Sequence, residues 1–218
     1  MGAVTGMMQE WRGGAAGPPP AASRPAQALT RDEWRVHYGA PGAADALAHE
    51  FRRRLLPLME AGGPNPETLF VCIGTDRSTG DALGPLVGSL LLEGGLPEAW
   101  VVGTLANPVH ATNMGTVLAM LRHRRPRPVT VAVDACLGRA DNVGMVALGT
   151  GALRPGAGVK KELPPVGDLY ITGNVNVGGF MEYFVLQNTR LSLVMDMARV
   201  IAAGLLQALI PPGPDTGR

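Results

Sequence analysis

Apolar positions follow two different periodicities from about residue 68 onward. Continuous apolar runs of strand length occupy 69–73, 99–103 and 128–136, and between them apolar residues recur every three or four positions. Short continuous runs are typical of buried parallel strands, whereas the wider spacing is typical of amphipathic helices. The alternation of the two predicts an α/β domain with a mainly parallel central sheet.

The other elements are predicted in the same way. Helices are expected over 82–93, around 117–121, from 180 to 186 and along 191–205, where Leu191, Val194, Ala198, Ile201 and Leu205 would form one buried face. Further strands are expected over 142–148 and 166–172, joined by a Gly- and Pro-rich loop. The segment 173–179 is predicted to be a turn between a strand and a helix.

Three segments divide the chain. Residues 1–28 are dominated by Gly, Ala and Pro and are predicted to be a disordered tail. Residues 30–61 are predicted to be a helical arm: Thr30 and Glu33 resemble a capping box that would begin a helix carrying Trp34. A second helix in the arm would bury Leu47, Phe51, Leu55 and Leu58, with the Arg52–Arg54 run on a solvated face. The main domain would cover 66–210.

The net charge indicates which kinds of partner the protein binds, and the cysteine content indicates in which cellular compartment it lies. The formal net charge is +1, from 19 basic and 18 acidic residues, so no strong field favours nucleic acid or an anionic membrane. Cys72 and Cys136 are expected to be reduced core residues, and no signal peptide is recognised. The sequence therefore predicts a cytoplasmic protein with a protein or peptide partner, and a homo-oligomer is one option.

Aspartates follow two of the predicted strands. Asp76 and Asp81 lie in the polar loop after the strand at 69–73, and Asp134 lies near the end of the strand at 128–136. Parallel strands end at one edge of a sheet, where ligands bind, so Asp81 and Asp134 are expected to meet. Two close carboxyl groups can hold one proton between them and activate water. The alternatives are a helix N-cap for Asp81 and turn roles for Asp134 and Asp76.

Several polar residues are candidates for binding a substrate. His110 follows Asn107 and Pro108 in a loop, and it is a candidate base or ligand; a surface or capping role is the alternative. Asn174 and Asn176 offer amide donors beside a Gly-rich turn, and bonding within the turn is the alternative. The loop 74–81 lacks the residues of a P-loop, which argues against nucleotide binding.

Three longer motifs resemble those of the sporulation protein YyaC family, which is related to the spore germination protease. The motifs span Ile73–Pro85, Gly103–Ala111 and Gly167–Glu182, and the resemblance covers about 66–210. It implies a three-layer α/β/α fold like that of the germination protease and the hydrogenase maturation proteases. It also implies that Asp81 and Asp134 match the two essential aspartates of the germination protease.

The chain lacks one feature of the hydrogenase maturation proteases, the histidine of their nickel site. Those enzymes recognise nickel with acidic residues at these two places and a later histidine. All four histidines of this chain precede Asp134, so the nickel site is not reproduced and neither a metal nor another cofactor is expected.

Three hypotheses about function follow. The first is a peptidase acting on a protein substrate during spore formation or germination, located in the spore or forespore, with Asp81 and Asp134 as catalytic residues. Asp76, Asn107, His110, Asn174 and Asn176 would then bind the substrate. The second is a non-catalytic sporulation factor that binds a peptide or protein in the same cleft. The third is a divalent-metal hydrolase with Asp76, Asp81, Asp134 and His110 as ligands.

Overall fold

A computed structural model of the chain describes residues 33–62, 67–123, 127–155, 163–179 and 181–210. Six strands form one sheet in the order β1-β5-β6-β4-β2-β3. Their bounds are β1 Trp34–His37, β2 Thr68–Cys72, β3 Val101–Val102, β4 Val129–Gly138, β5 Met145–Thr150 and β6 Leu169–Val177. Neighbouring pairs among β6, β4, β2 and β3 are parallel, and β5 runs antiparallel between β1 and β6. The predicted α/β class with a mainly parallel sheet is confirmed.

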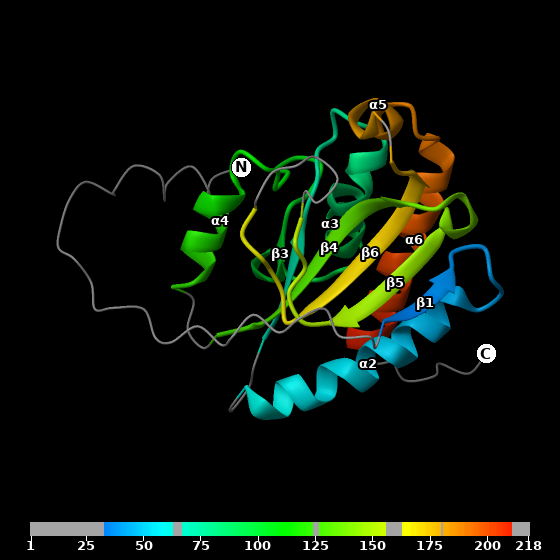
Figure 1. Cartoon of the computed structure of the whole chain (residues 1–218). Coiled ribbons are helices and arrows are strands. Elements are labelled where there is room, and N and C mark those ends of the chain that lie inside the picture. Colours follow the sequence, from blue (N-terminus) through cyan, green and yellow to red (C-terminus); the bar gives the residue numbers. More distant parts are fainter. Residues whose placement is uncertain (1–32, 63–66, 124–126, 156–162, 180, 211–218) are drawn as a thin grey trace, which may run out of the picture.

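Helices cover the two faces of the sheet unequally (Figure 1). Helices α2 (Ala43–Ala61), α3 (Leu83–Glu93) and α6 (Leu191–Leu209) pack on what we call the three-helix face. Helix α4 (Met114–Leu121) packs on the opposite side, the α4 face. The short helix α5 (Glu182–Gln187) contacts β6 and the single turn η1 (Gly80–Ala82). The result is the expected arrangement of a sheet between two helical layers.

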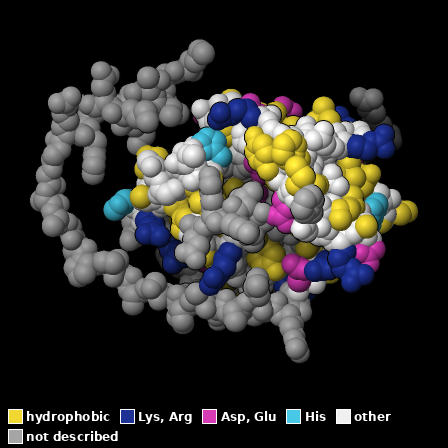
Figure 2. Space-filling model, turned by 45° about the horizontal axis from the view of Figure 1, so that its top comes forward, with side chains coloured by type: hydrophobic (Ala, Val, Ile, Leu, Met, Phe, Trp, Pro, Cys, Tyr) yellow, Lys and Arg dark blue, Asp and Glu magenta, His cyan; other side chains and the backbone are white. Residues whose placement is uncertain are grey.

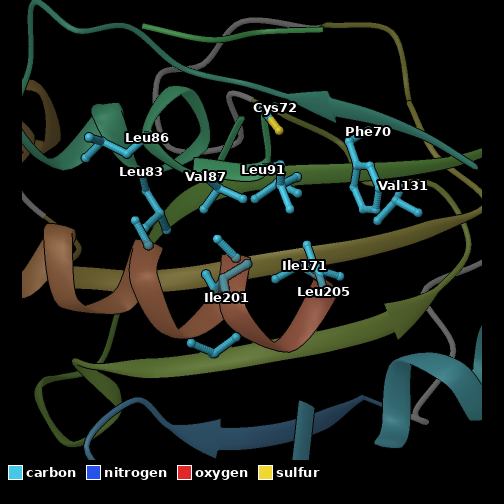
Figure 3. Close-up of a cluster of buried hydrophobic side chains, with 14 of the residues drawn as sticks. Phe70, Cys72, Leu83, Leu86, Val87, Leu91, Val131, Ile171, Ile201 and Leu205 are labelled. Atoms are coloured by element: carbon cyan, nitrogen blue, oxygen red, sulfur yellow. The ribbon is translucent and has the colours of Figure 1, made fainter. Parts of the chain in front are cut away.

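The larger core lies on the three-helix face. Alternate strand residues such as Phe70, Val131 and Ile171 point to this side, where they meet Leu83 and Leu91 of α3 and Ile201 and Leu205 of α6 (Figure 3). The next residues along the same strands, including Leu69, Val71 and Ala132, form a smaller core with α4. Burial on both faces explains why β2 and β4 read as continuous apolar runs.

Helix α6 has the length and composition of a candidate membrane span. In the structure it is a core helix of the folded domain, because Val194, Met197, Ala198, Ile201 and Leu205 are completely or almost completely buried. The predicted buried face is confirmed except at Leu191, which is 59% exposed at the start of the helix.

Two predictions for the N-terminal arm are wrong. Trp34 lies in strand β1 instead of a helix, because Trp34 and Val36 alternate with Arg35 and His37 and pair with β5 in the main sheet. The arginine run is also not uniformly solvated. Arg54 is buried on α2, with its Nε atom 2.6 Å from Glu50 Oε1.

The turn predicted over 173–179 is wrong for most of its length, since β6 continues to Val177. Gly173 is paired with Ala135 inside the strand, and glycine suits this position because a Cβ atom there would collide with Leu83 and Met197 on the three-helix face. The tail predicted at 1–28 lies outside the described residues.

Candidate functional site

The loop between β2 and η1 places Asp81 at the carboxyl end of the parallel strands. The Thr75 backbone N–H donates to the Asp81 carbonyl oxygen over 3.1 Å, which closes the loop on itself. Gly74, with φ of 140°, makes this closure possible, because a Cβ atom there would lie 1.9 Å from that same oxygen. The Gly74 N–H also donates to Val109, so the loop is joined to the segment that carries His110.

Asp134 lies within β4, one residue past the point where β2 stops pairing with it. Cys72 is paired with Val133, and on the other side Asp134 is paired with Thr172 of β6. Val133 belongs to the core of the three-helix face, so the pleat of the strand directs Asp134 to the α4 face. Its side chain is buried, and Oδ1 accepts a hydrogen bond of 2.9 Å from the Ala135 N–H.

The charge of Asp81 acts on the pKa of Asp134. Burial raises the pKa of Asp134 well above its ordinary value, the negative charge of Asp81 raises it further, and the Ala135 hydrogen bond opposes both. Burial also raises the pKa of Asp81, against a hydrogen bond from the Thr75 backbone and the charge of His110. Asp134 is therefore the better proton holder, and Asp81 is the better base.

His110 is the third member of the site. Val109 forms a parallel bridge with Ile73 directly after β2, which brings the next residue, His110, beside the aspartate loop. The imidazole Nδ1 lies 2.9 Å from the Thr112 hydroxyl oxygen. A histidine near two carboxyl groups is typical of sites that perform general acid and base catalysis.

Asn174 is the fourth sequence candidate that the fold brings to this region. It lies on β6, two residues past Thr172 on the same face, and is paired with Cys136 of β4. The side chain is buried, and its Oδ1 atom has no hydrogen-bond partner within the described part of the chain. Ser78 Oγ, in the loop between β2 and η1, is also buried without a hydrogen-bond partner among the described residues. Buried polar atoms without partners are costly, and a ligand can satisfy them.

The remaining sequence candidates are exposed or make structural hydrogen bonds. Asp76 is exposed in the loop, where Oδ1 accepts a long hydrogen bond of 3.4 Å from the Thr75 hydroxyl. Asn107 is exposed and exchanges backbone hydrogen bonds with Thr104 in a turn. Asn176 donates from Nδ2 to the Thr189 hydroxyl over 3.2 Å and so ties the end of β6 to the segment before α6.

Sequence reasoning missed the neighbours that surround the aspartates. Cys136, interpreted as a core residue, is only partly buried and lies on the same face as Asp134. Burial raises the pKa of its thiol to about 11, and a hydrogen bond with Thr172 opposes this rise. Thr112 and Asn113 contact His110. Asn113 could have been found in the sequence, because asparagine is a common capping residue and it directly precedes the apolar pattern of α4. The position of Thr172 beside Asp134 could not, because it depends on strand register, which no local pattern encodes.

The described residues contain no group of three or more His, Cys, Asp or Glu side chains arranged to hold a metal ion. The metal-hydrolase hypothesis therefore has no preformed ligand set in that part of the chain. Asp76, one of its four suggested ligands, is exposed.

An apolar surface adjoins the end of β6. Val177, Met181, Tyr183 and Phe184 are all more than 40% exposed, although each is hydrophobic or aromatic. Hydrophobic side chains gather on the surface in the view of Figure 2. A groove of about 480 Å³ lies there, lined by Asn176, Val177, Gly178, Phe184, Val185 and Asn188. Clustered exposed apolar side chains mark surfaces that contact a ligand or another protein.

Comparison with known proteins gives one family and two similar proteins. A family model described as "Protein of unknown function (DUF1256)" matches residues 36–204. The chain is 61% identical over 137 residues to "Uncharacterized protein YyaC" of Bacillus subtilis (strain 168), covering 63% of this chain and 67% of that protein. The solved structure of a [NiFe] hydrogenase maturation protease, HycI from Thermococcus kodakarensis KOD1, is 17% identical, with a TM-score of 0.38, over 68% of this chain and 97% of that one.

Proposed function

The chain belongs to the DUF1256 family, and from its site geometry we propose that it is a peptidase in which Asp81 and Asp134 activate a water molecule. The family description names no activity, so the proposal depends on the residues of the site. The observation that carries it is the placement of Asp81, in the turn after β2, and of buried Asp134, just past the β2 pairing on β4, at the carboxyl edge of a parallel sheet.

The chemistry assigns a different role to each carboxyl group. Asp81, whose negative charge is favoured by His110, takes the proton from water as the water attacks the peptide carbonyl carbon. Asp134, which holds a proton more readily, donates a hydrogen bond to the developing oxyanion and supplies the proton for the leaving amine. His110 adds a further donor beside the pair.

Asn174 supports a peptide as the substrate. Its buried Oδ1 acceptor has no partner among the described residues and can accept a hydrogen bond from a backbone N–H of an extended peptide. The nearby groove beside Phe184 offers apolar contact for a side chain of the same peptide. A substrate in the spore or forespore is the expectation that the family resemblance adds.

One observation favours a second candidate function. The exposed apolar residues around α5 suit a protein that captures a peptide or protein without cutting it. In that case the aspartate pair would contact the partner as hydrogen-bonding groups.

The test is incubation of the purified protein with a broad peptide library, followed by mass spectrometry, with and without a chelator. We expect cleavage that the chelator does not affect and that falls at least about a hundredfold in Asp81→Asn and in Asp134→Asn. Asp76→Asn is the matched control and should cleave like wild type, because Asp76 is exposed outside the pair.

Other outcomes of the same assay separate the alternatives. Capture of peptides without any cleavage would replace the peptidase by the binding function. Loss of cleavage with the chelator alone would show that a metal ion carries the reaction.

A further inference from the structure

Hydrogen bonds fix the backbone of the segment that carries His110. The Asn113 side chain accepts from the His110 N–H at 2.8 Å through Oδ1 and donates to the Pro108 carbonyl at 2.9 Å through Nδ2. The His110 carbonyl in turn accepts from the N–H groups of Asn113 and Met114 at the start of α4. With the Gly74 to Val109 bond, these contacts set where the His110 side chain leaves the backbone.

A further contact sets the orientation of the ring. Thr112 Oγ1 lies 2.9 Å from His110 Nδ1, although Thr112 itself is exposed. A hydroxyl can donate to a bare ring nitrogen and can accept from a protonated one, so this contact persists in either charge state of the imidazole. It occupies Nδ1 and leaves Nε2 as the ring nitrogen that can bind another group.

We propose that Thr112 is a positioning residue whose hydroxyl holds the His110 ring so that Nε2 is presented to the Asp81 carboxyl. The proposal deepens the peptidase function proposed above and rests on it for its catalytic consequence. In the proposed arrangement the Thr112 hydroxyl acts on the imidazole, the imidazole on Asp81, and Asp81 on Asp134. It has the logic of a base oriented by a third group, in which the orienting group never touches the substrate.

Orientation matters because the ring has two unlike nitrogens. In the neutral ring a negative charge on Asp81 favours the proton on Nε2, and Thr112 then donates to Nδ1, so that Nε2 can donate a hydrogen bond toward the carboxyl pair or the substrate. Without the hydroxyl, both tautomers and several ring rotations become accessible. The fraction of molecules with a donor in the correct place then falls, while substrate contacts elsewhere are unchanged.

Thr112→Val tests the proposal, because valine keeps the shape of threonine and removes the hydroxyl. The first measurement is the nitrogen NMR spectrum of the His110 ring, assigned with a His110→Gln variant. We expect wild type to show one tautomer with Nδ1 hydrogen-bonded, Thr112→Val to show a mixture, and Thr112→Ser to restore the wild-type spectrum. Thr116→Val, which removes an exposed hydroxyl on α4, is the control and should match wild type.

The second measurement is peptide cleavage. Thr112→Val should lower kcat about tenfold with KM unchanged, and Thr112→Ser should recover most of the loss. A Thr112→Val ring spectrum identical to that of wild type would overturn the proposal. The spectrum needs no substrate, so a changed spectrum in a protein that cleaves nothing would support Thr112 as the positioning residue while the peptidase function fails.

Discussion

Glu50 on α2 and Asp134 on β4 are two acidic side chains that the fold buries almost equally, with 7% and 8% of their surfaces exposed. Their pKa values nevertheless move in opposite directions. Hydrogen bonds from Arg53 and Arg54 lower the pKa of Glu50 to about 2. Burial and the negative charge of Asp81 raise the pKa of Asp134 well above its ordinary value. The two shifts have different leading causes: the arginine hydrogen bonds outweigh burial at Glu50, whereas burial dominates at Asp134 and the charge of Asp81 adds to it.

The comparison separates a structural charge from a chemical one. Glu50 lies against two arginines, with Arg53 Nη2 at 2.7 Å and Arg54 Nε at 2.6 Å, so its charge is compensated and holds α2 together. Asp134 lies beside another carboxyl group, an arrangement that costs stability when both are ionised. Sites that tolerate such a cost are typically sites of catalysis or binding.

The largest stability effect is expected on the structural side of the comparison. Glu50→Gln leaves the buried Arg54 guanidinium without its carboxylate, which should lower the free energy of unfolding by about 3 kcal/mol. Urea denaturation at neutral pH measures it. The folded variant should keep the wild-type cleavage rate, since Glu50 lies outside the site. A loss below about 0.5 kcal/mol would mean that the ion pair is not structural.

A smaller effect of opposite sign is expected on the chemical side. The folded protein disfavours ionised Asp134, so wild type loses stability as pH rises above about 3.8, the ordinary value for this group. Asp134→Asn resembles the protonated form and should therefore be more stable than wild type at neutral pH. The gain should disappear below about pH 3.8, and thermal unfolding across a pH series measures it.

The same pH series should show the reverse behaviour for Glu50. A lowered pKa contributes stability above the ordinary value of 4.5 that is lost as pH falls toward about 2. The stability difference between wild type and Glu50→Gln should therefore shrink over that interval. Parallel pH profiles for Asp134→Asn and Glu50→Gln would contradict the comparison.

The smallest expected effect uses Cys136 as a reporter of the charge on Asp134. The negative charge of Asp134 contributes to the raised pKa of this thiol, which is about 11. Asp134→Asn should lower that pKa by less than about one unit, measured from the ultraviolet absorbance of the thiolate. Cys72, whose thiol pKa is raised by complete burial, does not titrate in the same range. An unchanged Cys136 value would show that the two side chains do not interact.

The sequence was sufficient where local pattern and fold agree. Helix α3 and strands β2 and β4 follow directly from apolar spacing, and the rule that parallel strands end together predicts the placement of Asp81 and Asp134 at one edge of the sheet. The sequence pattern does not predict which strands far apart in the chain pair with each other, such as β1 with β5. Trp34 was misplaced because a four-residue strand gives too short an alternation to outweigh a capping pattern, and β5 alone defines it.

The environment of the aspartates was also only partly predictable. His110 was selected by its chemistry, but its approach to Asp81 depends on the bridge between Ile73 and Val109. Asn174 and Asn176 looked equivalent in the sequence, yet one is buried with an unpaired oxygen and the other ties β6 to Thr189. Side-chain surroundings of this kind are set by strand register, which a local pattern does not encode.

The position of β1 has a consequence for the order of events during synthesis. Trp34 pairs with Leu148, so the first described strand waits for more than one hundred further residues before its partner exists. At typical rates of about 5 to 20 residues per second, the wait is roughly 5 to 20 seconds. During that time β1 has no partner strand, because β5 has not yet been synthesised. The edge of the sheet is thus the earliest part of the described structure to be made and one of the last to be completed.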